Sequence, residues 1–108
     1  MSTQFKKGVL DLCVLAQISK LDMYGYEIVQ MISEHMEVNE STIYPILRRL
    51  TKEGYFETYM QESSEGPARK YYKITESGAH HLQATYVEWM SFSKSVLELL
   101  KGVEKHES

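Results

Sequence analysis

Apolar residues recur at helical spacing in the first third of the chain. The first such segment runs from Phe5 to about Lys20, and its apolar surface is wide because it includes Leu10, Val14, Leu15 and Ile18. A helix that is apolar on most sides is expected to be buried on most sides. Two explanations remain open: this is the central helix of a single core, or it also lies against a second subunit.

A second helix is predicted from Gly25 to about Met36, because the side chains of Ile28, Ile32 and His35, together with Met31, fall on one face.

A third, short helix is predicted in the segment "NESTIYPILRRLTKEGY", residues 39–55. Asn39 and Ser41 are both suitable N-caps, and Gly54 is a suitable stop. Pro45 is easily accommodated if Ser41 is the cap, since donors in the first turn have no partner within the helix. With Asn39 as the cap, Pro45 lies deeper and implies a local kink.

The pattern then changes to partial alternation. The segment from Tyr55 to Glu62 is aromatic and β-branched, which predicts a strand, and "RKYYKIT", residues 69–75, predicts its return strand. The intervening "SSEGPA" is typical of a loop. The segment therefore indicates a β-hairpin with a cationic second strand.

A long final helix is predicted from Glu76 to Lys105, capped by Thr75. Its apolar residues follow a four-three repeat, which is typical of a helix that pairs with another helix. The members of this seam are Leu82, Tyr86, Trp89, Ser93, Val96, Leu100 and Val103.

Three helices followed by a hairpin is the order of a winged helix. The fold class we expect is mainly α with a small β-hairpin: a winged helix-turn-helix plus a long C-terminal dimerisation helix. Residues 1–75 form the DNA-binding part, and residues 76–108 form the dimerisation helix and a short tail, in a single compact unit. At 108 residues the core is modest, so association of two copies is favoured.

Charge is unevenly distributed along the chain. The net charge is −3, but residues 48–73 hold six Lys or Arg and four Glu, a local net of +2. Local charge rather than net charge steers a polyanion, so one basic face on an acidic body is expected.

The chain offers little for catalysis. The lone cysteine, Cys13, cannot form an internal disulfide and fits a reducing compartment. His80 and His81 are adjacent and therefore diverge on a helix, which makes a poor metal site. We expect no enzymatic activity, no catalytic residue, no metal and no cofactor, in a cytoplasmic protein without a membrane segment.

Three stretches, "YGYEI", "STIYPILRRLTKEGYFE" and "EGPARKYYKITESG", resemble in order and spacing the PadR family of bacterial transcriptional regulators. The short C-terminal part with one tryptophan is similar to the compact subgroup with a single C-terminal helix. The resemblance implies that the third helix and the basic hairpin contact DNA. The implied DNA-binding residues are Ser41, Thr42, Tyr44, Pro45, Arg48, Arg49, Lys52, Arg69, Lys70 and Lys73. Short polar groups at the helix start and cations along its flank suit major-groove and phosphate contacts.

The resemblance also implies a homodimer formed by the last helix, through Leu82, Tyr86, Trp89, Val96 and Leu100. In a drug-responsive member of the subgroup, tryptophans flank an apolar cavity at the dimer centre. By that likeness the candidate effector residues are Trp89, Phe92, Ser93, Phe5 and Val9, and the ligand is small, planar and aromatic. The alternative is that Trp89 only packs the dimer interface.

Together these features predict a transcriptional regulator: a homodimeric repressor that binds a pseudo-palindromic DNA operator and is released by a small apolar or aromatic effector. Half-sites are then about one DNA turn, ~34 Å, apart. The alternative function is a winged-helix protein–protein adaptor without sequence-specific DNA binding, since fold alone does not determine function.

Overall fold

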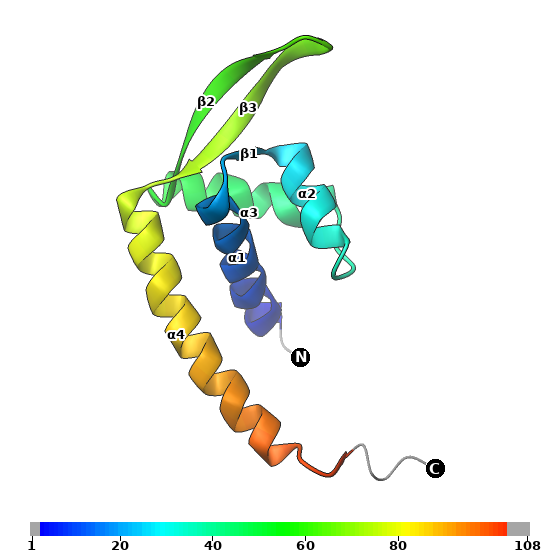
Figure 1. The fold of residues 1–108 in the computed structure, drawn as a ribbon, viewed down its shortest axis with the longest axis vertical. Coiled ribbons are helices and arrows are strands. Elements are labelled where there is room, and N and C mark those ends of the chain that lie inside the picture. Colours follow the sequence, from blue (N-terminus) through cyan, green and yellow to red (C-terminus); the bar gives the residue numbers. More distant parts are fainter. Residues whose placement is uncertain (1–2, 104–108) are drawn as a thin grey trace.

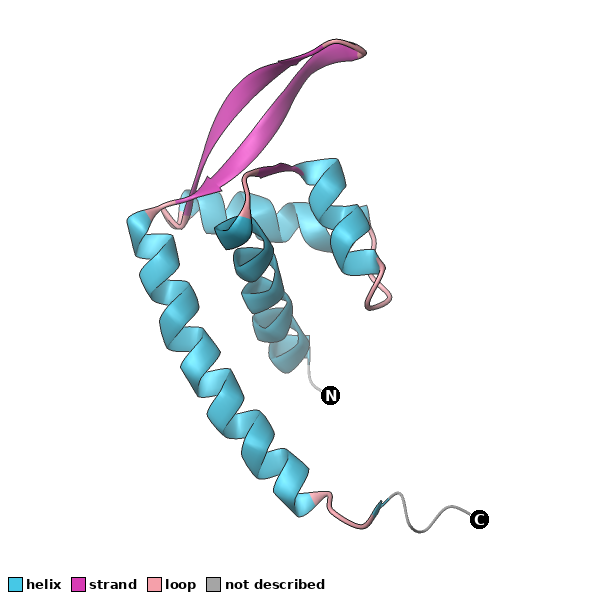
Figure 2. Cartoon of the chain, viewed as in Figure 1, coloured by secondary structure: helices cyan, strands magenta, loops and turns pink. Residues whose placement is uncertain are grey.

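The computed structural model describes residues 3–103, with side chains from residue 8 onward. Four helices accompany a small antiparallel sheet within that range (Figures 1 and 2). The elements in chain order are α1 (Thr3–Lys20), β1 (Met23–Tyr24), α2 (Gly25–Ser33), α3 (Glu40–Lys52), β2 (Phe56–Ser63), β3 (Gly66–Ile74) and α4 (Glu76–Leu99).

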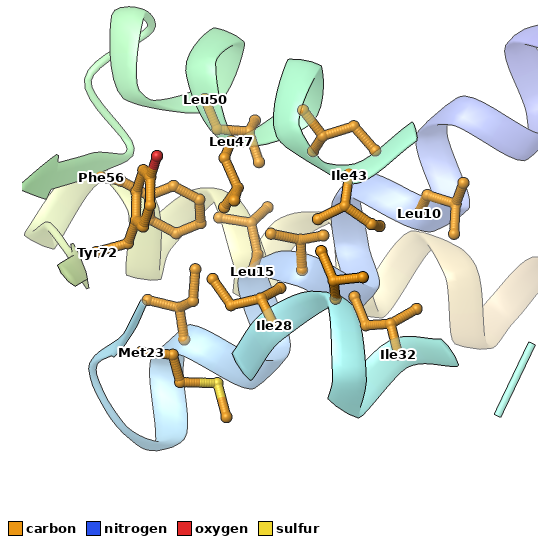
Figure 3. Close-up of a cluster of buried hydrophobic side chains, with 14 residues drawn as sticks. Leu10, Leu15, Met23, Ile28, Ile32, Ile43, Leu47, Leu50, Phe56 and Tyr72 are labelled. Carbon is orange, nitrogen blue, oxygen red and sulfur yellow. The ribbon is translucent and has the colours of Figure 1, made fainter. Parts of the chain in front are cut away.

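The core lies where α1, α2, α3 and the base of the hairpin meet. Leu15 of α1, Ile28 of α2 and Leu47 of α3 are fully buried, and Phe56 and Tyr72 close the core from the hairpin side (Figure 3). The rings of Phe56 and Tyr72 meet edge to face with their centroids 6.2 Å apart. The wide apolar surface of α1 is therefore explained largely by its central position inside one chain.

The second helix is shorter than its sequence pattern predicts. α2 ends at Ser33, and His35 and Met36 follow in a turn whose amides bond back to the Ile32 carbonyl. The expectation that His35 continues the apolar face is wrong, because its side chain is exposed and its Nδ1 lies 3.2 Å from the Met31 carbonyl oxygen.

The structure decides between the two N-caps predicted for α3. Asn39 is the N-cap, and its side chain accepts a hydrogen bond from the Ser41 amide at 3.0 Å. Pro45 consequently lies beyond the first turn, where it removes a donor that residue 41 would otherwise accept. Gly54 ends the helix at a φ of +89°, as expected for a glycine stop.

The hairpin is longer and its turn tighter than predicted. β2 and β3 reach Ser63 and Gly66, which are paired, so the expected six-residue loop is a two-residue turn, with an irregularity in the strand pairing between Gln61 and Ser63 next to it. β3 is the middle strand, because β1 pairs with its inner end through Met23–Tyr72 and Tyr24–Tyr71. β1 was not predicted; its two residues carry no strand pattern of their own.

α4 starts as predicted and ends earlier. The Thr75 side chain accepts from the Gly78 amide at 3.0 Å and donates to the Gly54 carbonyl at 2.7 Å, which joins the start of α4 to the end of α3. The helix stops at Leu99, and Gly102 follows with a φ of +91°, so the expected continuation to Lys105 is wrong up to residue 103 and lies outside the described residues beyond it. In the part of the chain that the structure describes, no helix is long and apolar enough to cross a membrane.

Candidate nucleic-acid interface

α3 divides into a buried face and a narrow exposed face. Ile43, Leu47 and Leu50 are at most 1% exposed, and together with Ile46 they anchor the helix in the core. The opposite stripe carries exposed residues at helical spacing, all of them predicted DNA-binding positions: Ser41, Pro45, Arg48 and Lys52. The helix thus presents a small polar group, a flat ring and two cations along one line.

The first turn of α3 is organised by its cap. The Ser41 hydroxyl donates to Asn39 Oδ1 at 2.6 Å, in addition to the amide bond to the same oxygen. Thr42 lies half-buried on the flank of the stripe. Ser41 is therefore held in place before any ligand arrives, which lowers the conformational entropy that a contact must overcome.

Tyr44 is partly used inside the protein. Its ring is half-buried against the core, and a Cβ placed on Gly25 would lie only 2.9 Å from the Tyr44 hydroxyl oxygen. Gly25 is thus the position at which the start of α2 makes room for α3. DNA contact by the remaining exposed part of Tyr44 stays a prediction.

The two adjacent arginines differ in their surroundings. Arg49 donates to Asp11 Oδ1 of α1 at 2.8 Å and lies 3.4 Å from Glu53, and the hydrogen bond to Asp11 raises its pKa. Arg48 is exposed, and within the described residues it has no carboxylate within ion-pair distance. The structure gives Arg49 an internal role that the sequence did not indicate, and this pairing competes with the DNA contact predicted for Arg49.

Tyr72 lies at the base of the hairpin, beside α3. Burial raises the pKa of Tyr72, and the positive charge of Arg48 acts in the opposite direction. Arg48 of α3 thus acts electrostatically on a residue of the hairpin base.

The three predicted cations of the hairpin lie on different faces. Side chains alternate along a strand, so Lys70 shares a face with Tyr72, the side on which α3 lies, whereas Arg69 and Lys73 are on the other face. Arg69 is half-buried with its guanidinium 4.6 Å from the centre of the Tyr24 ring, and Lys73 is directly opposite Glu57 on β2. Lys70 is the hairpin cation best placed to act together with Arg48.

α4 carries two neighbouring apolar stripes. Leu82 packs against the core of its own chain, and Trp89 and Val96 are half-buried. Tyr86 and Leu100, both predicted dimerisation residues, are 47% and 49% exposed. Sequence reasoning missed Met90 and Leu97, which are 48% and 67% exposed and extend the same face at helical spacing; a four-three reading starting at Tyr86 finds them.

The candidate effector residues are only partly brought together. Trp89 and Phe92 are neighbours, with ring centroids 6.2 Å apart and planes tilted by 43°. Ser93 and Val9 are half-buried, and the Phe5 side chain lies outside the described residues. A hollow on α4 includes Ser93 and is otherwise lined by Met90, Ser91, Lys94, Leu97 and Glu98. The effector site stays a prediction.

The described side chains form neither a metal-binding group nor a reactive cysteine. From residue 8 to residue 103, no three His, Cys, Asp or Glu side chains come together as a metal-binding group. Cys13 is half-buried, and burial raises the pKa of its thiol, which disfavours the reactive thiolate.

Comparison with known proteins agrees with this geometry. Residues 14–84 match the transcriptional regulator PadR-like family. A PadR-like transcriptional regulator from Bacillus cereus is 41% identical, with a TM-score of 0.83 over 93% of this chain and 99% of that one. A Streptococcus mutans structure is also 41% identical, with a TM-score of 0.82 over 89% and 90% of the two chains. A Lysinibacillus sphaericus protein is 35% identical over 91% of this chain and 94% of its own. The chain therefore belongs to the PadR-like family of winged-helix transcriptional regulators, as its motifs predicted.

Proposed function

We propose that this DNA-binding regulator is a homodimeric repressor that binds a pseudo-palindromic operator and leaves it when a small planar effector binds. The observation that carries the proposal is the exposed stripe of Ser41, Pro45, Arg48 and Lys52 on α3, with Lys70 of the hairpin on the same side. Such a stripe suits the major groove, while a cation on the hairpin suits a flanking phosphate.

The dimer follows from the exposed face of α4. Tyr86, Met90, Leu97 and Leu100 form an apolar stripe on a helix that a single chain leaves uncovered. Pairing with the same stripe of a second copy buries it with two-fold symmetry. Two copies of α3 then face two half-sites of one operator.

The effector part of the proposal rests on Trp89, half-buried on α4 beside Phe92. Stacking between aromatic rings adds roughly 0.5–1.5 kcal/mol beyond burial. Planar aromatic compounds are expected to quench Trp89 fluorescence and to weaken operator binding over the same concentration range. Unchanged emission across a broad panel, in protein that still binds DNA, would remove the effector site from the proposal.

Arg48 and Arg49 offer a matched test of DNA binding, because the two arginines are adjacent and, among the described residues, Arg49 has carboxylate partners whereas Arg48 has none. Fluorescence polarisation on the protein's own upstream DNA should show that Arg48→Ala weakens binding and reduces the salt slope by about 0.9, the loss of one phosphate contact. Arg49→Ala should instead lower stability by roughly 0.5–1 kcal/mol, as expected for a partly exposed ion pair, and leave the salt slope unchanged.

The same titration separates the alternatives. If the wild-type protein shows no salt-sensitive, sequence-preferring binding at submicromolar concentration, the operator proposal is wrong and the protein–protein adaptor takes its place. If Arg49→Ala lowers the slope as much as Arg48→Ala, both arginines contact phosphate and the division between them is wrong.

A further inference from the structure

The base of the hairpin is held on one face and along one edge. On one face Phe56 and Tyr72 are buried in the core. Along the edge of β3 that lies away from β2, the backbone pairing with β1 ends at Tyr24 and Tyr71. Beyond that point, the hairpin projects away from the three-helix body (Figure 1). Side chains rather than backbone bonds must therefore determine its direction.

Five side chains make contacts at or beyond the end of that pairing. The Tyr59 hydroxyl of β2 donates to Asp22 Oδ2 at 2.6 Å, across 37 positions of sequence. The Arg69 guanidinium of β3 covers the Tyr24 ring, with 4.6 Å from its central carbon to the ring centre. Stacking of Tyr59 on Tyr71, with centroids 5.6 Å apart and planes within 14°, joins the two contacts across the hairpin.

These contacts attach the hairpin to the segment that also supports α3. Tyr24 immediately precedes α2, and its amide donates to Glu27 Oε1 at 3.1 Å, which fixes the start of that helix. The next residue, Gly25, is the one against which the Tyr44 ring of α3 packs. A continuous series of contacts thus runs from the hairpin through Tyr24 and Gly25 to the recognition helix.

A small rotation at the hairpin base has a large effect at its tip. Ser63 lies four positions beyond Tyr59, roughly 13 Å at ~3.3 Å per residue. A rotation of about 10° at the base would therefore move the tip by about 2 Å, more than the spread of hydrogen-bond lengths. A phosphate contact from the hairpin requires that this angle be held.

We propose that Asp22, Tyr24, Tyr59 and Arg69 form a clamp that holds the hairpin at a set angle to α3, and that Tyr59 and Arg69 are positioning residues for DNA binding. The functional half of this inference rests on the proposed operator binding, since it assigns Lys70 a contact that only a correctly directed hairpin can make. The structural half, a hairpin held by its side chains, is independent of DNA.

Hydrogen exchange of the free protein tests the structural half. Tyr59→Phe removes only the hydroxyl that bonds Asp22, and exchange in residues 56–72 should rise severalfold while α1 is unaffected. The matched control is Tyr26→Phe, because the Tyr26 ring lies in the same cluster, 6.3 Å from that of Tyr24, and its hydroxyl makes no hydrogen bond to the described residues. Equal exchange in the wild type and Tyr59→Phe would overturn the clamp.

A double-mutant cycle with Lys70→Ala tests the functional half. In the wild-type background Lys70→Ala should weaken operator binding about fivefold, which corresponds to about 1 kcal/mol; in the Tyr59→Phe background it should have little further effect. An equal loss in both backgrounds would show that Lys70 reaches DNA without the clamp and would overturn its role. No loss in either background would instead contradict the proposed hairpin–DNA contact, and the exchange result would still decide the clamp.

The salt dependence defines the role of Arg69. If Arg69 positions the hairpin, Arg69→Ala should weaken binding, and in the Lys70→Ala background, where the hairpin contact is already absent, it should leave both affinity and salt slope unchanged. A further drop of about 0.9 in the slope there would mean that Arg69 itself contacts a phosphate, which overturns its assignment as a positioning residue.

Discussion

At the scale of single residues, two glycines lie so close to neighbouring atoms that any other residue would bring its Cβ into contact with them. Gly25 lies under the Tyr44 ring. Gly78 lies against the Tyr55 carbonyl, and a Cβ added at Gly78 would be 2.8 Å from the Ile74 side chain. The neighbour of Gly25 is the far end of a side chain that can swing away. The neighbour of Gly78 is backbone, which cannot. The two positions therefore differ in how a larger residue is tolerated.

Gly78→Ala should be strongly destabilising, since the alanine methyl group must displace either the first turn of α4 or the backbone at Tyr55, just before β2. Overpacking of this kind costs about 1–3 kcal/mol, measurable as a lower midpoint of denaturant unfolding. Gly66→Ala is the control, because nothing lies within 4 Å of an added Cβ there. A Gly78→Ala protein as stable as that control would mean that the α4 junction can shift freely.

Tyr59 should titrate unusually late. The hydrogen bond to Asp22 raises the pKa of Tyr59 to about 12 from an ordinary value of 10. Because the folded-state pKa is the higher one, its contribution to stability is complete below pH 10 and is lost as the pH rises through about 12. Phenolate absorbance of the wild type minus that of Tyr59→Phe should show one group with this late midpoint; a midpoint near 10 would mean that the hydroxyl is not bonded to Asp22 in solution.

At the scale of elements, local rules predicted well and long-range pairing did not. The cap at Thr75 and the stop at Gly54 follow from chemistry within a few residues, so the sequence alone identified them, while for α3 it left Asn39 and Ser41 open and the structure shows Asn39. β1 exists only because β3 lies beside it, and Arg49 is paired only because Asp11, 38 positions earlier, is brought next to it. Helical periodicity predicted the buried face of α3, Ile43, Leu47 and Leu50, but it did not separate the exposed residues of the predicted DNA-binding set from the half-buried Thr42, Tyr44 and Arg49. The clamp was missed because each of its contacts, Asp22 with Tyr59 and Tyr24 with Arg69, joins residues far apart in the sequence.

Pro45→Ala should stabilise α3, because alanine restores a donor for the carbonyl of residue 41 and removes a clash that costs up to about 3 kcal/mol in a helix interior. We expect a gain of roughly 1–2 kcal/mol in the free energy of unfolding. Operator affinity should fall at the same time, since Pro45 is exposed on the stripe. A variant that is less stable than wild type would show that the local backbone is adapted to proline.

At the scale of the whole molecule, the elongated shape supports the proposed pairing of two copies. The chain extends 54 Å along its longest axis but 31 and 23 Å along the others, with α4 forming one long side (Figure 1). An elongated small chain leaves more surface uncovered than a compact one. The uncovered apolar surface is concentrated on α4.

Leu97→Glu should separate the proposed dimer into monomers, because it places a charge in the exposed apolar stripe of α4, where Leu97 is 67% exposed in the single chain. Analytical ultracentrifugation would measure the change in mass, and operator affinity should fall with it. The control is Ser95→Glu, which adds the same charge at an exposed position outside that stripe. A Leu97→Glu protein that sediments as a dimer would place the interface elsewhere.

The contacts that hold α3 in place, Tyr44 on Gly25 and Arg49 with Asp11, matter for any attempt to change the DNA sequence that this regulator binds. A chimaera whose new helix lacks a counterpart of Tyr44 or Arg49 would lose the fit to Gly25 or the ion pair with Asp11. A chimaera that exchanges only positions 41, 45, 48 and 52 leaves these contacts intact. New operator preferences should therefore be transferable by the exposed positions alone, while a helix without these two residues should pack wrongly against the core.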